Sequence, residues 1–352
     1  MRVIDAGPNA GHRPPFEVDG GRHVPPFDVP DRVAAIRAGL AAVPGLQFTD
    51  VELIDPSALS PLHDPGYVAF LRDACAELAA ARTPDREPAV YPSVFPYRSG
   101  QHARTPKARI GEYCFDTYTP LLAGTFDAAL RMASAAVGAA EAVASGEPVA
   151  YALGRPPGHH AERAKCGGYS YLNGTALAAD RLSRLGPVAV LDVDVHHGNG
   201  TQHLFYDRPD VLTVSIHGDP AGLFPYFSGY ADETGTGRGL GFNRNLPLPP
   251  KTDDRGYQPA LETALELIAR HRPAFLVVAL GFDAHVDDPI GGLALSTDSF
   301  GRMAGLIRQL AVPTVLVQEG GYGLAALGSC AAAFVRGYQK INHRATEPQS
   351  GQ

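Results

Sequence analysis

Two histidine-rich segments carry side chains suited to metal-assisted hydrolysis. The first is residues 155–160 (Arg-Pro-Pro-Gly-His-His), and the second is residues 192–200 (Asp-Val-Asp-Val-His-His-Gly-Asn-Gly). In the second segment, Asp192, Asp194 and His196 occupy alternate positions, so in an extended chain their side chains share one face. Carboxylates and an imidazole are typical ligands of a catalytic zinc ion, which keeps one position open for water.

We expect one divalent ion, held by Asp194, His196 and Asp283. Zinc suits these three ligands, and ferrous iron is the alternative for the same oxygen and nitrogen donors. Such an ion lowers the pKa of bound water and polarises a carbonyl. The pattern therefore predicts a hydrolytic site.

The remaining polar residues suggest the catalytic groups. The pair His159 and His160 could transfer protons, and Tyr322, which follows two glycines, could donate a hydrogen bond to a developing oxyanion. Asp192 and Asn199 then remain to orient the two histidines. This set predicts attack of water on an amide.

Composition limits the classes of protein to consider. The chain has 352 residues, 45% of them hydrophobic, and a formal net charge of −7. The negative charge argues against nucleic acid or an anionic membrane as partner. No apolar run approaches the length of a membrane span, and the first residues lack the apolar core of a signal peptide. Four scattered cysteines fit a reduced cytoplasm better than a disulfide scaffold.

Strand and helix signals alternate along the chain. Five short apolar runs predict strands, at residues 149–153, 188–193, 211–216, 275–280 and 314–317. Helical signals lie between them, such as a helix capped by Asn173 that runs to Leu185, and the helical spacing from Ala260 to Ile268. This alternation predicts an α/β protein whose mostly parallel central sheet is flanked by helices.

Each predicted strand is followed directly by one of the polar motifs. In open α/β sheets, ligands bind beyond the carboxyl ends of the strands. We therefore expect the five motifs to meet at one edge of the sheet.

We expect a single domain over residues 1–345, followed by a tail at 346–352. The segment from Thr83 to Pro120 is too long for an ordinary connection, which favours a functional loop or a disordered one. Its many aromatic residues argue against disorder. We expect many of these aromatic residues to be exposed, and because large apolar patches usually mark interfaces, this segment is a candidate interface.

The motifs resemble those of the zinc-dependent histone deacetylase/acetylpolyamine amidohydrolase superfamily, which has a three-layer arginase-deacetylase fold. The likeness runs nearly end to end, and the N-terminal and loop segments point to the bacterial acetylpolyamine amidohydrolases. It implies the same zinc ligands as above, with His160 as general base and Tyr322 as the residue that polarises the carbonyl. It also implies that the Thr83–Pro120 loop builds a homodimer and narrows the tunnel mouth.

The resemblance implies structural sites for a monovalent cation, potassium or sodium. The first would be formed by side chains and carbonyls of Asp192, Asp194, His196, Ser215 and Ile216. The second would be formed by backbone near Phe205, Arg208, Val211 and Phe242.

The resemblance also implies a substrate tunnel. Tyr169 and Phe224 correspond to its aromatic walls, and the Gly168 carbonyl would accept the substrate amide N–H. A small N-acetylated amine, such as an acetylpolyamine, is therefore the expected substrate. Acetyl-lysine in proteins or peptides and an N-acylated biosynthetic intermediate are the alternatives.

Acidic residues that meet a cationic substrate in polyamine-specific relatives are replaced in this chain. The corresponding positions hold Lys107, Tyr118 and Ile290, while Glu112 and Asp116 lie nearby in the sequence. From this we expect broader tolerance of neutral amines than a strict polyamine deacetylase would show.

Two other classes of function are considered. A dinuclear arginase-like enzyme needs an Asp-x-His-x-Asp string, and the string that starts at Asp194 lacks the final acid. A non-catalytic ligand-binding module would have lost a metal ligand, the base or the tyrosine, and all of these residues are present.

Overall fold

The centre of the molecule is an eight-stranded sheet in the order β10-β9-β8-β11-β12-β7-β1-β4. The structure, a computed structural model, describes residues 1–83, 87–96 and 103–340. Every neighbouring pair of strands in this sheet is parallel. The strands are β1 (Arg2–Asp5), β4 (Gln47–Asp50), β7 (Val149–Leu153), β8 (Val188–Asp192), β9 (Val211–Gly218), β10 (Asn243–Leu248), β11 (Phe275–Leu280) and β12 (Thr314–Gln318).

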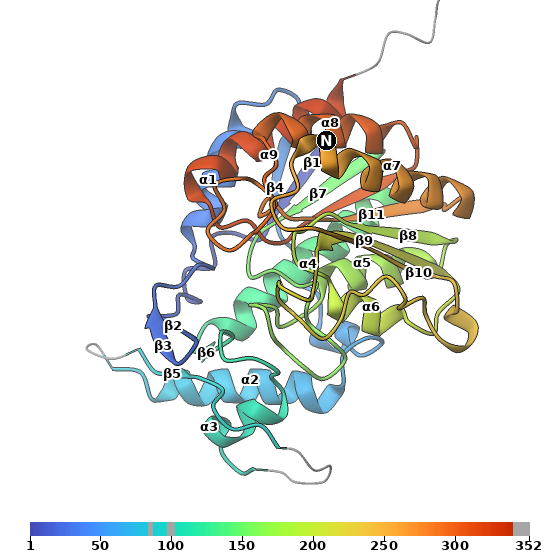
Figure 1. The fold of residues 1–352 in the computed structure, drawn as a ribbon. Helices are drawn as coiled ribbons and strands as arrows, with labels where there is room; N and C mark the ends of the chain where they lie inside the picture. The colour runs from blue at the N-terminus through green and yellow to red at the C-terminus, as the bar shows by residue number, and fades with distance from the viewer. Residues whose placement is uncertain (84–86, 97–102, 341–352) are drawn as a thin grey trace, which may run out of the picture.

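Helices cover both faces of the sheet, which confirms the predicted three-layer α/β fold (Figure 1). One layer contains α1 (Asp31–Ala41), α7 (Asp254–His271), α8 (Thr297–Arg308) and α9 (Leu324–Gln339). The other contains α2 (Pro65–Ala80), α4 (Thr125–Ala144), α5 (Gly174–Ser183) and α6 (Asn199–Phe205). Each layer packs a cluster of buried hydrophobic side chains against the sheet. No helix in the described part of the chain is long and apolar enough to span a membrane.

The five predicted strands are present as β7, β8, β9, β11 and β12, with ends that differ by at most two residues. The predicted cap of α5 is also present, because the Asn173 side chain accepts a hydrogen bond from the Ala176 amide at 2.8 Å. The strands β1, β4 and β10 were not predicted. The sheet has β4 and β10 at its two edges, and β10 contains Pro247, which weakens a strand signal.

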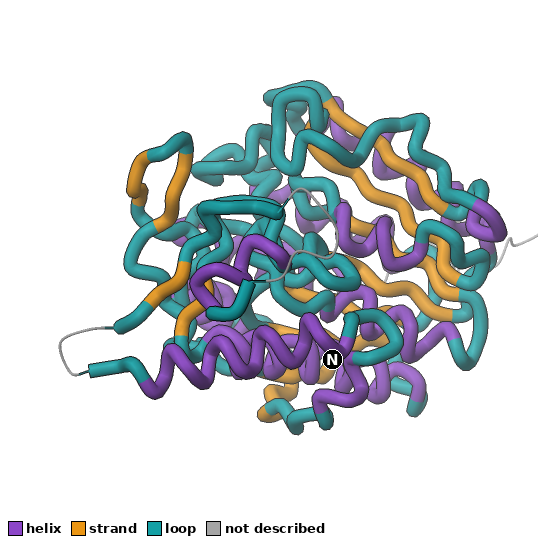
Figure 2. The backbone as a smooth tube through the Cα atoms, turned by 90° about the horizontal axis from the view of Figure 1, so that it is seen from below, coloured by secondary structure: helices purple, strands orange, loops and turns teal. Residues whose placement is uncertain are grey.

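Two small antiparallel pairs lie to one side of the large sheet (Figure 2). The strands β2 (Glu17–Asp19) and β3 (Arg22–Val24) form a hairpin. The strands β5 (Ala89–Val90) and β6 (Leu121–Leu122) pair across the long loop segment. The short helices are α3 (Pro106–Arg109) and the 3-10 helices η1 (Pro56–Leu59), η2 (Ile110–Glu112) and η3 (Gly237–Gly239).

The Thr83–Pro120 segment is less exposed than its composition suggests. Tyr113 stacks on Phe70 with ring centroids 4.6 Å apart, and Phe115 lies 6.1 Å from Phe224. Among the described aromatic residues of this segment, Phe95 is exposed and the others are half-buried. The expectation of many exposed aromatics was therefore wrong, because these rings pack against the body of the protein. Tyr97 and the predicted tail at 346–352 lie outside the described residues.

Candidate metal centre

The polar motifs meet at one edge of the sheet. The five strands that carry them are neighbours in the order β9-β8-β11-β12-β7. Since all of these strands are parallel, their carboxyl ends point to the same edge. Segments as distant in sequence as residues 155–160 and 319–322 are thereby brought together.

Asp194, His196 and Asp283 form a compact group of metal-binding atoms. One ligand atom from each residue lies within 4.8 Å of the other two, and all three side chains are buried. The His196 Nδ1 atom lies 3.3 Å from Asp194 Oδ1 and 3.3 Å from Asp283 Oδ2. Two carboxylates and an imidazole are donors that fit a divalent zinc or iron ion.

The electrostatics of this group also fit a cation. Burial, and then the neighbouring Asp194 carboxylate, raise the pKa of Asp283 to about 7. A positive ion between the two carboxylates would offset their repulsion. Backbone amides orient the oxygens, since Gly320 donates to Asp194 Oδ2 at 2.7 Å and Val195 to Asp283 Oδ1 at 2.8 Å. Gly320 has little room for a side chain, because a Cβ there would lie 2.0 Å from Asp283 Oδ2.

The adjacent histidines have different hydrogen-bond partners. His159 Nδ1 lies 2.9 Å from Asp192 Oδ2, and His160 Nδ1 lies 2.8 Å from Asn199 Oδ1. Burial opposes charge on His159, but the carboxylates of Asp194 and Asp192 outweigh it and raise its pKa. Burial, together with the nearby His159, holds the pKa of His160 well below its usual value. His160 is therefore the neutral member of the pair.

Tyr322 is held from both sides. Its amide donates to Asp288 Oδ2 at 2.6 Å, and the Arg32 guanidinium lies over its ring, 4.5 Å from the centroid. Arg32 also donates to the carbonyls of Gly321 and Glu319, each at 2.6 Å. Burial raises the pKa of the Tyr322 phenol well above its usual value, so the hydroxyl stays protonated and can donate.

Three residues that hold Tyr322 and the two histidines in place were not identified from the sequence; Arg32 and Glu319 are buried and Asp288 is half-buried. Besides Arg32 and Asp288, Glu319 accepts hydrogen bonds from the amides of Gly158 at 2.6 Å and His159 at 3.0 Å. Its place in the Glu-Gly-Gly-Tyr string could have indicated Glu319. Arg32 and Asp288 belong to none of the polar motifs found in the sequence, so nothing in their local pattern marks them.

A pocket of about 170 Å³ leads to these groups. Its lining includes all five predicted substrate-binding residues, which are Tyr118, Gly168, Tyr169, Phe224 and Ile290. It also includes His160, His196 and Tyr322. The sequence did not indicate the other lining residues, which are Glu17, Asp19, Phe27, Leu223 and Tyr226.

The Gly168 backbone passes directly beside the proposed base. A Cβ at Gly168 would lie 2.3 Å from His160 Cδ2 and 2.9 Å from Phe224 Cε1, and φ there is +53°. The buried Asp116 carboxylate accepts the Gly168 N–H, and Thr119 Oγ1 accepts the Tyr169 N–H at 3.0 Å. Asp116 thus supports the pocket wall and does not line the pocket.

The residues expected at the first monovalent-cation site lie at and just after the end of β8 and within β9, where Asp192 and Ser215 are partners in register. Ser215 Oγ lies 2.7 Å from His217 Nδ1. At the second expected site, the Phe205 carbonyl accepts the Arg208 N–H at 3.0 Å, and the Phe242 carbonyl accepts the Thr213 N–H at 2.9 Å.

Comparison with known proteins extends this description. Residues 27–338 match the family model described as the histone deacetylase domain. The chain is 40% identical over 328 residues to an acetylpolyamine amidohydrolase of Burkholderia pseudomallei, covering 93% of this chain and 95% of that protein. It is 39% identical to an acetylpolyamine amidohydrolase of Mycoplana ramosa, covering 96% and 99%. A crystal structure of the acetylpolyamine aminohydrolase from Burkholderia pseudomallei superposes with a TM-score of 0.89 at 38% identity, covering 96% of this chain and 98% of that one.

Proposed function

Because this chain belongs to the histone deacetylase domain family, whose similar members are amidohydrolases and deacetylases, we propose that it is a zinc-dependent hydrolase of small N-acetylated amines. The observation that carries the proposal is the pocket, whose lining joins His160, His196 and Tyr322 to aromatic walls. The family assignment and the amide-hydrolysing activity hold whichever acetylated amine proves to be the substrate.

The residues of the site divide the work of amide hydrolysis. A divalent ion held by Asp194, His196 and Asp283 would acidify a water molecule and polarise the amide carbonyl. Neutral His160 accepts the proton of the attacking water, and Asn199 holds its ring in place. The Tyr322 hydroxyl donates a hydrogen bond to the oxyanion as negative charge develops.

The other side chains orient the substrate and the histidines. The Gly168 carbonyl lies beside His160, where it can accept the substrate amide N–H. Asp192 holds the His159 ring next to the reaction centre, with its Oδ2 atom 2.9 Å from His159 Nδ1. The rings of Tyr169 and Phe224 form the walls of a narrow pocket. A slender aliphatic amine fits such a pocket better than a folded protein surface does.

We also propose a structural potassium or sodium ion beside the end of β8, where Asp192 is the register partner of Ser215 in β9. Residues 1–345 are proposed to act as one domain, with the site at the common edge of its sheet.

The test combines metal analysis with steady-state kinetics. Purified enzyme should hold one divalent ion per chain, whereas two would favour the arginase-like alternative. The substrates are acetylputrescine, acetylspermidine, an acetyl-lysine peptide and amides with longer acyl chains. Higher kcat/KM for the small acetylated amines than for the peptide supports the proposal. Absence of turnover with every amide by the metal-loaded enzyme overturns it and favours a ligand-binding module.

Replacing Tyr322 with Phe should reduce kcat by about 10²- to 10³-fold, the effect typical of removing one oxyanion donor. KM should change little, since this hydrogen bond strengthens mainly in the transition state. Steady-state kinetics with a small acetylated amine measures both values. Tyr230→Phe is the matched control, because Tyr230 is exposed and does not line the pocket. Near-full activity of Tyr322→Phe would exclude the oxyanion role.

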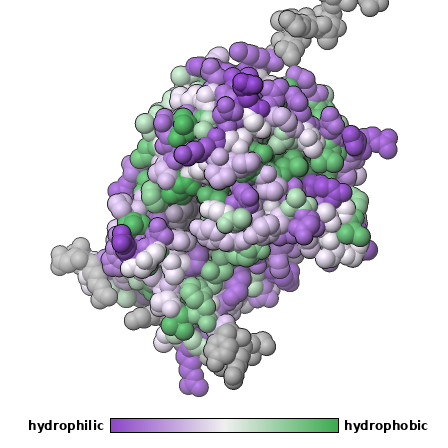
Figure 3. Space-filling view, viewed as in Figure 1, coloured by the Kyte–Doolittle hydropathy of each residue, from purple (hydrophilic) through white to green (hydrophobic). Residues whose placement is uncertain are grey.

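We propose a homodimer in which the Thr83–Pro120 segment meets the partner near the pocket mouth. Val94 and Phe95 of this segment are 75% and 40% exposed. Figure 3 shows hydrophobic side chains gathered low on the face, over α2 and α3. Such patches commonly mark interfaces.

Light scattering at micromolar concentration should give a mass near twice the 37.2 kDa of one chain. Val94→Asp should shift the protein toward monomer, whereas Leu185→Asp, at another exposed position, should not. A monomeric protein with full activity would contradict this assembly.

A further inference from the structure

A tight turn at residues 167–170 carries the Gly168 carbonyl that is proposed to accept the substrate N–H. Gly167 and Ser170 close the turn with two hydrogen bonds, from Ser170 N to Gly167 O at 2.8 Å and from Gly167 N to Ser170 O at 3.1 Å. The two central residues, Gly168 and Tyr169, have φ of +53° and +64°. Positive φ at both central positions is typical of a type I′ turn. Tyrosine is in a disfavoured conformation at such a position.

The orientation of one peptide group decides whether Gly168 can serve the substrate. A type II′ turn has positive φ at its first central residue only, because the peptide between the two central residues is turned over. Tyrosine adopts the negative φ of that second position readily. The relaxed alternative would therefore reverse the Gly168 carbonyl, so contacts from outside the turn must hold the observed orientation.

Two residues of the Thr83–Pro120 segment supply those contacts. The Asp116 carboxylate accepts the Gly168 N–H, and Thr119 Oγ1 accepts the Tyr169 N–H at 3.0 Å. The N–H and C=O of a trans peptide point in opposite directions. Since the Tyr169 N–H points at Thr119, the Gly168 C=O points away from it. A long hydrogen bond from Ser170 Oγ at 3.4 Å uses one lone pair of this carbonyl, which leaves the other for a substrate N–H.

Backbone pairing places Asp116 beside this turn. Cys114 and Cys166 are paired in parallel, and Phe115 N donates to the Cys166 carbonyl at 3.1 Å. The next N–H along this pairing is that of Gly168, and an Asp116 side-chain oxygen accepts it. The long segment therefore fixes the turn through both its backbone and a side chain.

Asp116 and Thr119 form one buried unit. Asp116 Oδ2 accepts the Thr119 hydroxyl at 3.2 Å, which leaves the lone pairs of that hydroxyl for the Tyr169 N–H. Asp116 Oδ1 accepts the amides of Tyr118 and Thr119 at 3.0 and 3.1 Å. Together with Gly168 N, four neutral donors thus meet one carboxylate. An ionised carboxylate can accept from all four, whereas the amide of asparagine has only one oxygen.

We propose that Asp116 and Thr119 are positioning residues, which hold the Gly168–Tyr169 peptide in the orientation that lets the Gly168 carbonyl accept the substrate amide N–H. This inference rests on the proposed deacetylase function and deepens it. Neither residue lines the pocket, so both act through the turn. The disfavoured φ of Tyr169 persists because turning the peptide over would leave a buried N–H without its acceptor.

The experiment uses two matched substrates, an N-acetylated amine and the acetate ester in which oxygen replaces the N–H group. The proposed metal ion, base and oxyanion donor act on both substrates. The ratio of kcat/KM for the amide to kcat/KM for the ester therefore reports recognition of the N–H. Asp116→Asn should reduce this ratio roughly three- to tenfold, the effect of losing one hydrogen bond to the substrate. Thr119→Val, which removes the hydroxyl but keeps the shape of the side chain, should reduce it similarly.

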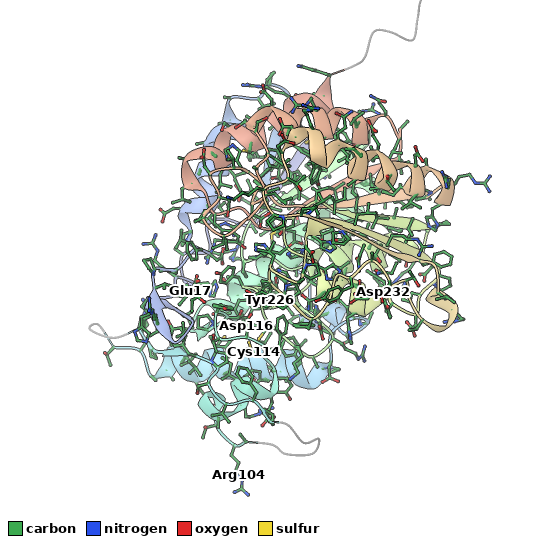
Figure 4. The ribbon with its side chains drawn as sticks, in the orientation of Figure 1. Glu17, Arg104, Cys114, Asp116, Tyr226 and Asp232 are labelled. Atoms are coloured by element: carbon green, nitrogen blue, oxygen red, sulfur yellow. The ribbon has the colours of Figure 1, made fainter. Side chains whose placement is uncertain are left out.

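Two controls separate this role from a general loss of packing or charge. Thr119→Ser keeps the hydroxyl, so it should retain the ratio of the unaltered enzyme. Asp232→Asn removes the same net charge as Asp116→Asn and should leave the ratio unchanged. Asp232 is exposed and does not line the pocket, and it lies well away from Asp116 in Figure 4. Lys107 of the loop segment offers no control, because its side chain lies outside the described part of the structure.

Crystal structures of the variants give a second measurement that does not depend on activity. In Asp116→Asn and Thr119→Val, the central peptide of the turn should be turned over, with negative φ at Tyr169 and the Gly168 carbonyl reversed. Thr119→Ser should keep the positive φ. An unchanged turn in both Asp116→Asn and Thr119→Val would show that other contacts hold it, which overturns the inference.

Failure of this inference can be told apart from failure of the proposed function. If the unaltered enzyme hydrolyses the amide but Asp116→Asn and Thr119→Val keep its ratio, the inference is overturned and the proposed function stands. The same conclusion follows if Thr119→Ser lowers the ratio as much as Thr119→Val does. If the unaltered enzyme hydrolyses neither substrate, the proposed function fails, and the crystal structures decide whether the two residues hold the turn. If Asp116→Asn does not fold, the two Thr119 variants decide the outcome.

Discussion

Asp283→Asn is expected to remove the divalent ion and, with it, all measurable turnover. The Asp283 carboxylate is one of three buried donors, and asparagine supplies a neutral oxygen in its place. The loss of one negative charge weakens the attraction for a dication in a site shielded from water. Metal analysis of the dialysed protein should show less than one ion per chain, and kinetics should show no hydrolysis.

The matched control for this variant is Asp287→Asn. Asp287 follows Asp283 in the same strand-end loop, but its side chain is 76% exposed and lies 3.8 Å from His285. Its replacement should leave metal content and kcat unchanged. Circular dichroism should show that Asp283→Asn keeps its secondary structure. Full metal content together with full activity in Asp283→Asn would refute the assigned ligand set.

His160→Ala should reduce kcat by about 10²- to 10⁴-fold, the contribution typical of a general acid–base residue. His160 lines the pocket, and its Nδ1 atom is engaged by Asn199, which leaves the other ring nitrogen for the attacking water. Metal content should be retained, because His160 is not among the three ligands. This separation of activity from metal content distinguishes His160→Ala from the Asp283 variant.

His203→Ala controls for the loss of an imidazole. His203 is exposed on α6 and does not line the pocket. The kcat of His203→Ala should therefore match that of the unaltered enzyme. If His160→Ala retained a kcat close to that of the unaltered enzyme, proton transfer would have to be assigned elsewhere. His159 would then be the next residue to test, since it also lies beside Asp194.

Much of the candidate metal centre could be predicted from the sequence, because the residues that form it directly follow strands. The alternation of Asp192, Asp194 and His196 is visible in the primary structure, and a parallel sheet brings its strand ends to one edge. The five central strands were also predicted, because their apolar runs are buried on both faces.

The residues that sequence did not indicate depend on contacts between distant segments. Arg32 reaches Tyr322 from a helix nearly three hundred residues earlier, and Asp19 reaches the pocket from a hairpin. No local pattern distinguishes either residue from an ordinary surface charge. The edge strands β4 and β10 contain few apolar residues, so their sequences do not predict strands. They are strands because they pair with the neighbouring strand of the sheet.

The strand order also determines when the site can assemble during synthesis. β7 and β8, which precede the two histidine-rich segments, are separated in the sheet by β11 and β12, which are made much later. The nascent chain cannot close this part of the sheet until residues beyond Gln318 have left the ribosome. Such long-range parallel pairing makes folding slow. A chain truncated before Gln318 therefore cannot assemble the proposed catalytic site. Until β11 and β12 have been made, the unpaired edges of β7 and β8 are exposed and prone to aggregation.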